Sequence, residues 1–183
     1  MTYNPQKHHR RSIRLKGYDY SQAGLYFITI CTHNRACLFG KIENSKMILN
    51  ECGQIANNEW EKTPEIRNNV ELGDFIIMPN HIHIIIRLLG RGELHSPNNP
   101  NKLHSPNKQG VCDTPLRSPS QTIGAIVRGY KSSITKQLGL LGFNGKLWQR
   151  NYHEHIIRNE QSYMKISEYI INNPANWDND SLK

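Results

Sequence analysis

Two histidines separated by one residue are the first candidates for chemistry in this sequence. His81-Ile82-His83 opens an apolar run that continues to Leu89. Because side chains alternate between the two faces of a strand, both imidazoles would project from one face and Ile82 from the other. Two neutral imidazoles side by side supply half of a metal site. Such a pair is also common among ordinary core or surface histidines, but two polar rings within an apolar run need a reason.

A tyrosine and an asparagine one helical turn apart form the second candidate. Residues 159–173 carry apolar side chains at helical spacing, and Pro174 ends the pattern. At about 100° per residue, Tyr169 and Asn173 lie within about 40° of each other, at the edge of this apolar stripe. Two interpretations stay open here. The pair is either a boundary tyrosine with a C-capping asparagine, or a nucleophile with a third metal ligand.

The charge of the chain points to a polyanionic partner. Among 183 residues, 23 Lys and Arg against 15 Asp and Glu leave a net charge of +8. A surplus of this size attracts nucleic acid, although solvated basic faces without a ligand are the alternative. Residues 1–23 hold five basic residues and one acid, and residues 121–150 hold five basic residues and no acid. We therefore predict phosphate contacts from six side chains: Arg10, Arg11, Arg14, Arg128, Lys131 and Arg150.

The elements that must position these residues follow from hydrophobic periodicity. The predicted strands are residues 25–32, 36–39, 70–78 and 82–89, of which the first two are expected to form a hairpin. The predicted helices are residues 48–60, a second helix that follows an N-cap at Ser120, and residues 159–173. Residues 153–155 are expected to lie in a short polar segment. This set indicates an α+β fold, a ferredoxin-like antiparallel sheet with helices packed on it.

Residues 94–120 differ in composition from the rest of the chain. They are rich in Pro, Asn and Ser and contain the sequence LHSPN twice. This composition buries too little apolar area to offset chain ordering, so a flexible insertion is predicted. The chain then consists of a basic arm at residues 1–23, one domain at residues 24–177 that contains the insertion, and a tail at residues 178–183.

Cysteine usage and hydropathy indicate where the protein is expected to act. The four cysteines show no CxxC pairing, which favours reduced thiols over a disulfide framework. The sequence shows neither the apolar segment of a signal peptide nor an apolar run of the about 18 residues that a membrane helix needs. We therefore expect a cytoplasmic protein without membrane contact.

Three motifs, taken in order, resemble those of the REP-associated tyrosine transposases, a group within the single-tyrosine HUH transposases. They are MPNHIH at residues 78–83, LWQRNYHEHIIRN at residues 147–159 and YIINNP at residues 169–174. The resemblance covers about residues 26–177, without the insertion at residues 94–120. It implies a ferredoxin-like fold and a metal-dependent enzyme that cleaves and rejoins single-stranded DNA, here expected to be REP-type hairpin DNA.

The resemblance also implies roles for individual residues. His81 and His83 match the HUH pair that holds Mg²⁺ or Mn²⁺, and Asn173 falls where the family places a third, polar ligand. Tyr169 matches the nucleophile, which attacks the phosphate in line and leaves a 5′-phosphotyrosyl link and a free 3′-hydroxyl. The His153-Glu154-His155 part of the second motif carries no assigned role. The oligomeric state stays open between monomer and dimer.

Two other classes of function compete with this interpretation. The first is a non-catalytic or zinc-binding nucleic-acid-binding protein, in which His81, His83, His153 and His155 form a four-histidine site. The second is a metal-dependent hydrolase that uses water in place of Tyr169. A covalent protein–DNA adduct is expected only of the tyrosine mechanism.

Overall fold

The computed structural model describes residues 22–89 and 121–183. Several sequence predictions lie outside the described residues: the arm with Arg10, Arg11 and Arg14, the insertion at residues 94–120, the N-cap at Ser120, and Cys112. Within the described residues, Cys31, Cys37 and Cys52 are free thiols. None of the described helices is long and apolar enough to cross a membrane.

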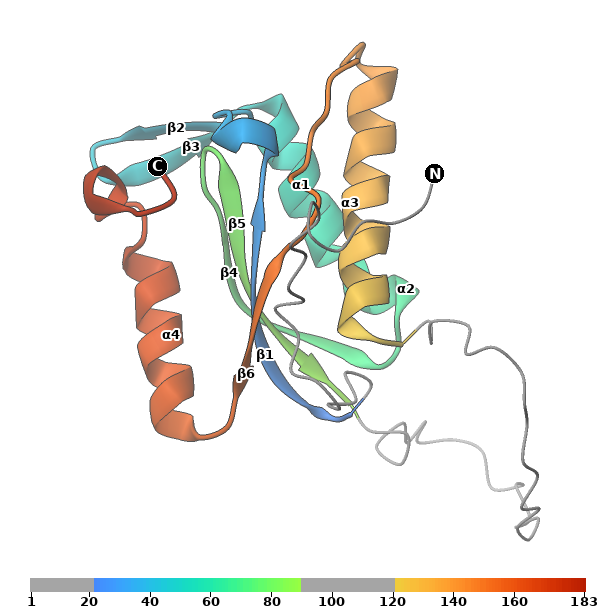
Figure 1. Cartoon of the computed structure of the whole chain (residues 1–183), viewed down its shortest axis with the longest axis vertical. Helices are drawn as coiled ribbons and strands as arrows, with labels where there is room; N and C mark the ends of the chain where they lie inside the picture. Colours follow the sequence, from blue (N-terminus) through green and yellow to red (C-terminus); the bar gives the residue numbers. More distant parts are fainter. Residues whose placement is uncertain (1–21, 90–120) are drawn as a thin grey trace, which may run out of the picture.

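A four-stranded antiparallel sheet forms the centre of the fold (Figure 1). Its strands are β1 (Gly24–Cys31), β4 (Val70–Ile77), β5 (His81–Leu88) and β6 (His153–Ile157). They lie in the order β4-β5-β1-β6, and every neighbouring pair is antiparallel. Each outer strand is reached through a helical connection that passes over one face of the sheet. This is the ferredoxin-like arrangement, and it confirms the predicted fold class.

Helices cover both faces of the sheet. α1 (Glu51–Glu61) and α3 (Ile123–Leu140) pack together on one face, and α4 (Glu160–Asn172) lies on the other (Figure 1). The short helix α2 (Thr63–Ile66) continues from α1. The α1–α3 face contains the larger core, with Ile82 and Ile84 of β5 in it, and the α4 face contains a smaller one around Ile85. Burial on both faces explains why residues 84–86 of β5 are three consecutive isoleucines.

The predicted hairpin between residues 25–32 and 36–39 is wrong. β1 pairs instead with β5 on one side and with β6 on the other. The hairpin in this region is formed by β2 (Gly40–Glu43) and β3 (Lys46–Leu49), which make a separate two-stranded sheet. Its turn residues Asn44 and Ser45 both have positive φ, as tight hairpin turns require. β1 is an apolar strand inside the sheet, and both of its partners, β5 and β6, lie far from it in the sequence.

Two further boundaries differ from the sequence prediction. The first helix begins at Glu51, because Asn50 caps it by accepting a hydrogen bond from the Gly53 amide, and Ile48 belongs to β3. α3 begins at Ile123 after an N-cap at Thr122. The short polar segment predicted around residues 153–155 forms the edge strand β6.

A candidate active site on the α4 face of the sheet

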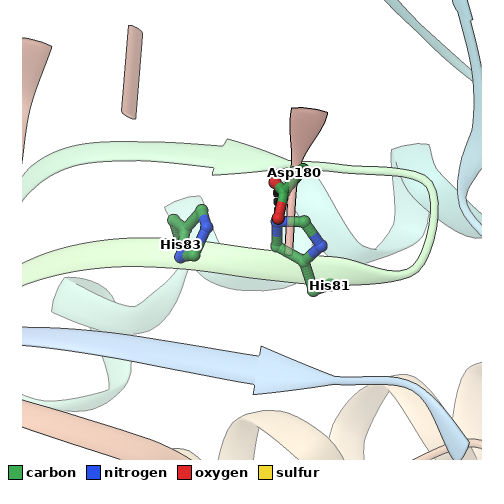
Figure 2. A group of neighbouring side chains, drawn as sticks. All are labelled: His81, His83 and Asp180. Atoms are coloured by element: carbon green, nitrogen blue, oxygen red, sulfur yellow. Dashed lines mark ion pairs between the residues drawn. The ribbon is translucent and has the colours of Figure 1, made fainter. Parts of the chain in front are cut away.

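Strand β5 places His81 and His83 side by side on the face that α4 covers (Figure 2). The intervening Ile82 points into the opposite core, as the strand alternation predicts. The two imidazole rings lie 4.5 Å apart between centroids and are almost fully buried, with 0% and 2% of their surface exposed. The structure therefore brings together the two histidines that strand alternation predicts to share one face.

Hydrogen bonds orient both rings. The Nδ1 atom of His81 lies 2.7 Å from Oδ1 of Asn80, an oxygen that only accepts, so Nδ1 carries the proton and Nε2 keeps its lone pair. Asn80 is held in turn, because its Nδ2 donates to the Leu182 carbonyl. The Nδ1 atom of His83 lies 2.9 Å from the Thr29 hydroxyl. Such partners behind an imidazole are typical of metal-binding histidines.

A carboxylate that the sequence analysis missed completes this group. Asp180 lies in the C-terminal segment, just after the short helix η2 (Trp177–Asn179), and its Oδ2 is 3.6 Å from Nε2 of His81 (Figure 2). The candidate ligand atoms of His81, His83 and Asp180 all lie within 4.8 Å of one another. No periodic pattern marks Asp180 in the sequence, because it follows the last helix in a short polar stretch.

Asn173, the predicted third ligand, lies next to the same group. Its Nδ2 donates to Oδ2 of Asp180 at 3.2 Å. Its Oδ1 is buried, and in the described part of the chain it has no hydrogen-bond partner; the same holds for Nε2 of His81. Buried acceptors left without donors need an explanation, and a divalent cation supplies one. The residues present therefore fit a metal ion, with His81, His83 and Asp180 as ligands and Asn173 beside them.

Burial keeps both histidines neutral at physiological pH. Desolvation lowers the pKa of His81 to about 4, partly opposed by the nearby Asp180. Desolvation also lowers the pKa of His83 to about 3, and the neighbouring His81 and His153 lower it further. Neutral imidazoles have a lone pair to offer, so both rings are ready for a metal without losing a proton.

These shifted pKa values predict an acid-sensitive fold. In the unfolded chain both histidines bind protons near pH 6.5, whereas in the folded protein they do so only near pH 4 and pH 3. Their contribution to stability is therefore complete above pH 6.5 and is lost as the pH falls towards 3. We expect the urea midpoint in chelator-treated buffer to fall over this range, and to fall less steeply in His83→Gln. The exposed His155→Gln is the control, and equal slopes in all three proteins would contradict the prediction.

Helix α4 brings Tyr169 to this group. Its hydroxyl lies 3.1 Å from Nε2 of His83, and its ring packs edge-on against Phe27. Burial, with the Asp180 charge nearby, raises the pKa of Tyr169 above its usual value, while Asn173 opposes the rise. Tyr163 points elsewhere, with its hydroxyl 3.4 Å from Oδ2 of Asp74. The two tyrosines therefore face different directions, as their spacing predicts.

A cavity of about 430 Å³ opens beside Tyr169 and His83. It is lined by Thr29 of β1, by Gln149 and Asn151 before β6, and by His153, the first residue of β6. The half-exposed Tyr169 therefore stands at the edge of a space that a substrate can enter.

The predicted phosphate-binding residues of the second basic segment lie in two kinds of environment. Arg128 on α3 and Arg150 before β6 are exposed. Lys131 donates from Nζ to the carbonyl oxygens of Gln149 and Asn151 at 2.9 and 3.1 Å, and burial lowers its pKa to about 8. Lys131 thus holds the segment that forms one wall of the cavity.

The four-histidine alternative gains no support from the geometry. His153 and His155 lie on β6, and β1 separates them from β5. Among residues 22–89 and 121–183, the only group of three or more His, Cys, Asp or Glu ligands close enough to hold a metal is His81, His83 and Asp180.

Comparison with known proteins gives one close relative and one shared fold. No protein-family model matches the sequence. An uncharacterized protein of Haemophilus influenzae is 44% identical over 180 residues, which cover 98% of this chain and 96% of the relative. Among solved structures, a REP-associated tyrosine transposase bound to a REP hairpin superimposes with a TM-score of 0.57 at 19% identity. That match covers 90% of this chain and 74% of the other, and it shows a shared fold.

Proposed function

This chain belongs to one family with the Haemophilus influenzae protein and has the fold of a REP-associated tyrosine transposase, and from that premise we propose that it is a DNA strand transferase. Its substrate is single-stranded DNA next to a hairpin of the REP type. It cleaves and rejoins that DNA through a covalent link to Tyr169, with a divalent metal, Mg²⁺ or Mn²⁺, as its cofactor.

One observation carries this proposal. The Tyr169 hydroxyl lies 3.1 Å from His83, within the group that also holds His81 and Asp180. A phenol beside a metal-ligating cluster, at the edge of an open cavity, is the arrangement that nucleophilic attack on a phosphodiester needs. A hydrolase or a purely structural metal site does not require a tyrosine at this position.

The mechanism follows from the groups present. A divalent ion held by His81, His83 and Asp180 would stabilise the negative charge that develops on the scissile phosphate. α4 holds the Tyr169 hydroxyl beside His83, where it would face a phosphate bound at this group. Phe27 stacks on His83 and packs edge-on against Tyr169, which restrains the His83 and Tyr169 rings. The Tyr169 oxygen forms a bond to phosphorus as the bond to the 3′-oxygen breaks. Because the link to Tyr169 conserves the phosphodiester bond energy, a 3′-hydroxyl reverses the reaction and rejoins DNA.

Incubation with DNA tests the proposal directly. The substrate is a labelled single strand that carries the hairpin flanking the protein's own gene, with Mn²⁺ or with chelator. We expect a labelled band at the mass of the protein plus DNA on denaturing electrophoresis, and only with Mn²⁺. Cleavage without any covalent band would indicate a hydrolase, and neither cleavage nor a band would contradict the proposal.

The exposed arginine beside the cavity predicts a measurable salt effect. Arg150 is exposed. If it neutralises one phosphate of the bound strand, Arg150→Gln reduces by one the number of counterions that binding releases. The slope of log affinity against log salt concentration should become shallower by about 0.7, the value for one phosphate of a single strand. Lys41→Gln is the control, because Lys41 lies on β2 and pairs with Glu43. Equal slopes in wild type and Arg150→Gln, measured by fluorescence anisotropy, would remove Arg150 from the DNA interface.

A further inference from the structure

One histidine of the cavity has no part in the mechanism described so far. His153 begins β6, where it is exposed and pairs across the sheet with Thr29. Thr29 pairs on its other side with His83. His83, Thr29 and His153 therefore form one row across three strands, on the face that carries α4. His153 lines the same cavity as His83 and Tyr169.

The sheet order places His153 opposite the nucleophile. α4 packs mainly on β4 and makes smaller contacts with β5 and β6. The Tyr169 hydroxyl itself lies against His83 of β5, so Tyr169 approaches the cavity from the β5 side. β6 is the opposite edge of the sheet, which makes its start the far wall of the cavity. An in-line displacement at phosphorus keeps the attacking and leaving oxygens on opposite sides. For a phosphate bound between Tyr169 and β6, the leaving oxygen would depart towards the side of the cavity that holds His153.

We propose that His153 is a catalytic general acid that protonates the departing 3′-oxygen, a role that rests on the proposed tyrosine mechanism. In this step the Tyr169 oxygen bonds to phosphorus, the bond from phosphorus to the 3′-oxygen breaks, and the imidazolium of His153 gives its proton to that oxygen. The phenol of Tyr169 releases one proton to solvent, and solvent returns one proton to His153, so the reaction consumes none. In the rejoining direction His153 accepts the proton of the attacking 3′-hydroxyl.

Three other side chains that line the cavity are poorer donors for this step. Gln149 and Asn151 carry amides that do not titrate in water. Cys31 is partly buried, and desolvation raises the pKa of its thiol. His155 lies on the same strand face two residues further along but is not among the residues that line the cavity. His155 therefore serves as a matched control for His153.

A substrate with sulfur in place of the scissile 3′-oxygen tests the assignment. A thiolate leaves without protonation, because a thiol is far more acidic than an alcohol. We expect His153→Gln to form the covalent adduct about 10²–10⁴-fold more slowly than wild type on ordinary hairpin DNA. On the 3′-phosphorothiolate strand we expect its rate to lie within a few-fold of the wild-type rate. His155→Gln should match wild type on both substrates.

The outcomes distinguish a failure of the His153 assignment from a failure of the tyrosine mechanism on which it rests. If wild type forms no adduct on either substrate, the tyrosine mechanism itself fails. If wild type forms the adduct and His153→Gln is equally fast on ordinary DNA, His153 is not the general acid. If His153→Gln is slow to the same degree on both substrates, His153 binds or positions the strand, which also overturns the assignment. Thermal unfolding verifies that the exposed substitution leaves the fold intact.

Discussion

We expect Tyr169→Phe to abolish the covalent protein–DNA adduct and to leave hairpin binding within about twofold of wild type. The substitution removes one oxygen, which is the proposed nucleophile, and keeps the ring that packs against Phe27. Without that oxygen the hydroxyl that lies 3.1 Å from His83 is lost, so we expect the adduct to fall below detection. Denaturing electrophoresis measures the adduct, and fluorescence anisotropy measures binding.

Tyr163→Phe is the matched control for this experiment. Tyr163 lies on the same helix, but its hydroxyl contacts Asp74 and not the histidine cluster. Its loss should leave adduct formation at the wild-type level. If Tyr169→Phe still forms the adduct, or if Tyr163→Phe alone loses it, the nucleophile has been assigned to the wrong tyrosine.

We expect Asp180→Asn to weaken metal binding strongly. The change keeps the shape of the side chain but removes the charge from the group 3.6 Å from Nε2 of His81. Loss of a hydrogen-bonding partner behind a metal ligand costs about 10–100-fold in affinity, and loss of a charged ligand should cost at least that much. Titration of the protein with Mn²⁺, followed by calorimetry or electron paramagnetic resonance, measures the affinity in the absence of DNA.

Asp178→Asn provides the control within the same segment. Asp178 is 89% exposed at its side chain and pairs with Lys183, away from the histidines. Its substitution should leave Mn²⁺ affinity unchanged. If Asp180→Asn binds Mn²⁺ as tightly as wild type and Asn173→Ala binds it much more weakly, the third ligand is Asn173, as the sequence predicts.

The local part of the site follows from the sequence because its geometry depends on repeating backbone structure. His81 and His83 share a face, since a strand repeats every two residues, and the apolar run around them marks a buried strand. Tyr169 and Asn173 share one flank of a helix, since they are four residues apart. Each inference needs only the type of element, which hydrophobic periodicity indicates well.

Strand pairing was less predictable, because partners in a sheet are chosen by contacts between distant segments. Residues 36–39 follow β1 closely and suggested a hairpin, yet β1 is paired on both sides by β5 and β6. β6 itself was missed because an edge strand with exposed His153 and His155 shows little hydrophobic pattern. Its position nevertheless decides which residue faces Tyr169 across the cavity.

The sequence by itself determined the ferredoxin-like class, the paired histidines and the helix that carries Tyr169. Only the tertiary structure decided that Asp180 joins them. Its segment folds back over the end of β5, where Asn80 donates to the Leu182 carbonyl and Arg35 donates to the Ser181 carbonyl. These contacts join residues far apart in the chain, and no periodicity relates their positions. A metal needs ligands that converge in space, and convergence between distant segments is a property of the packed chain.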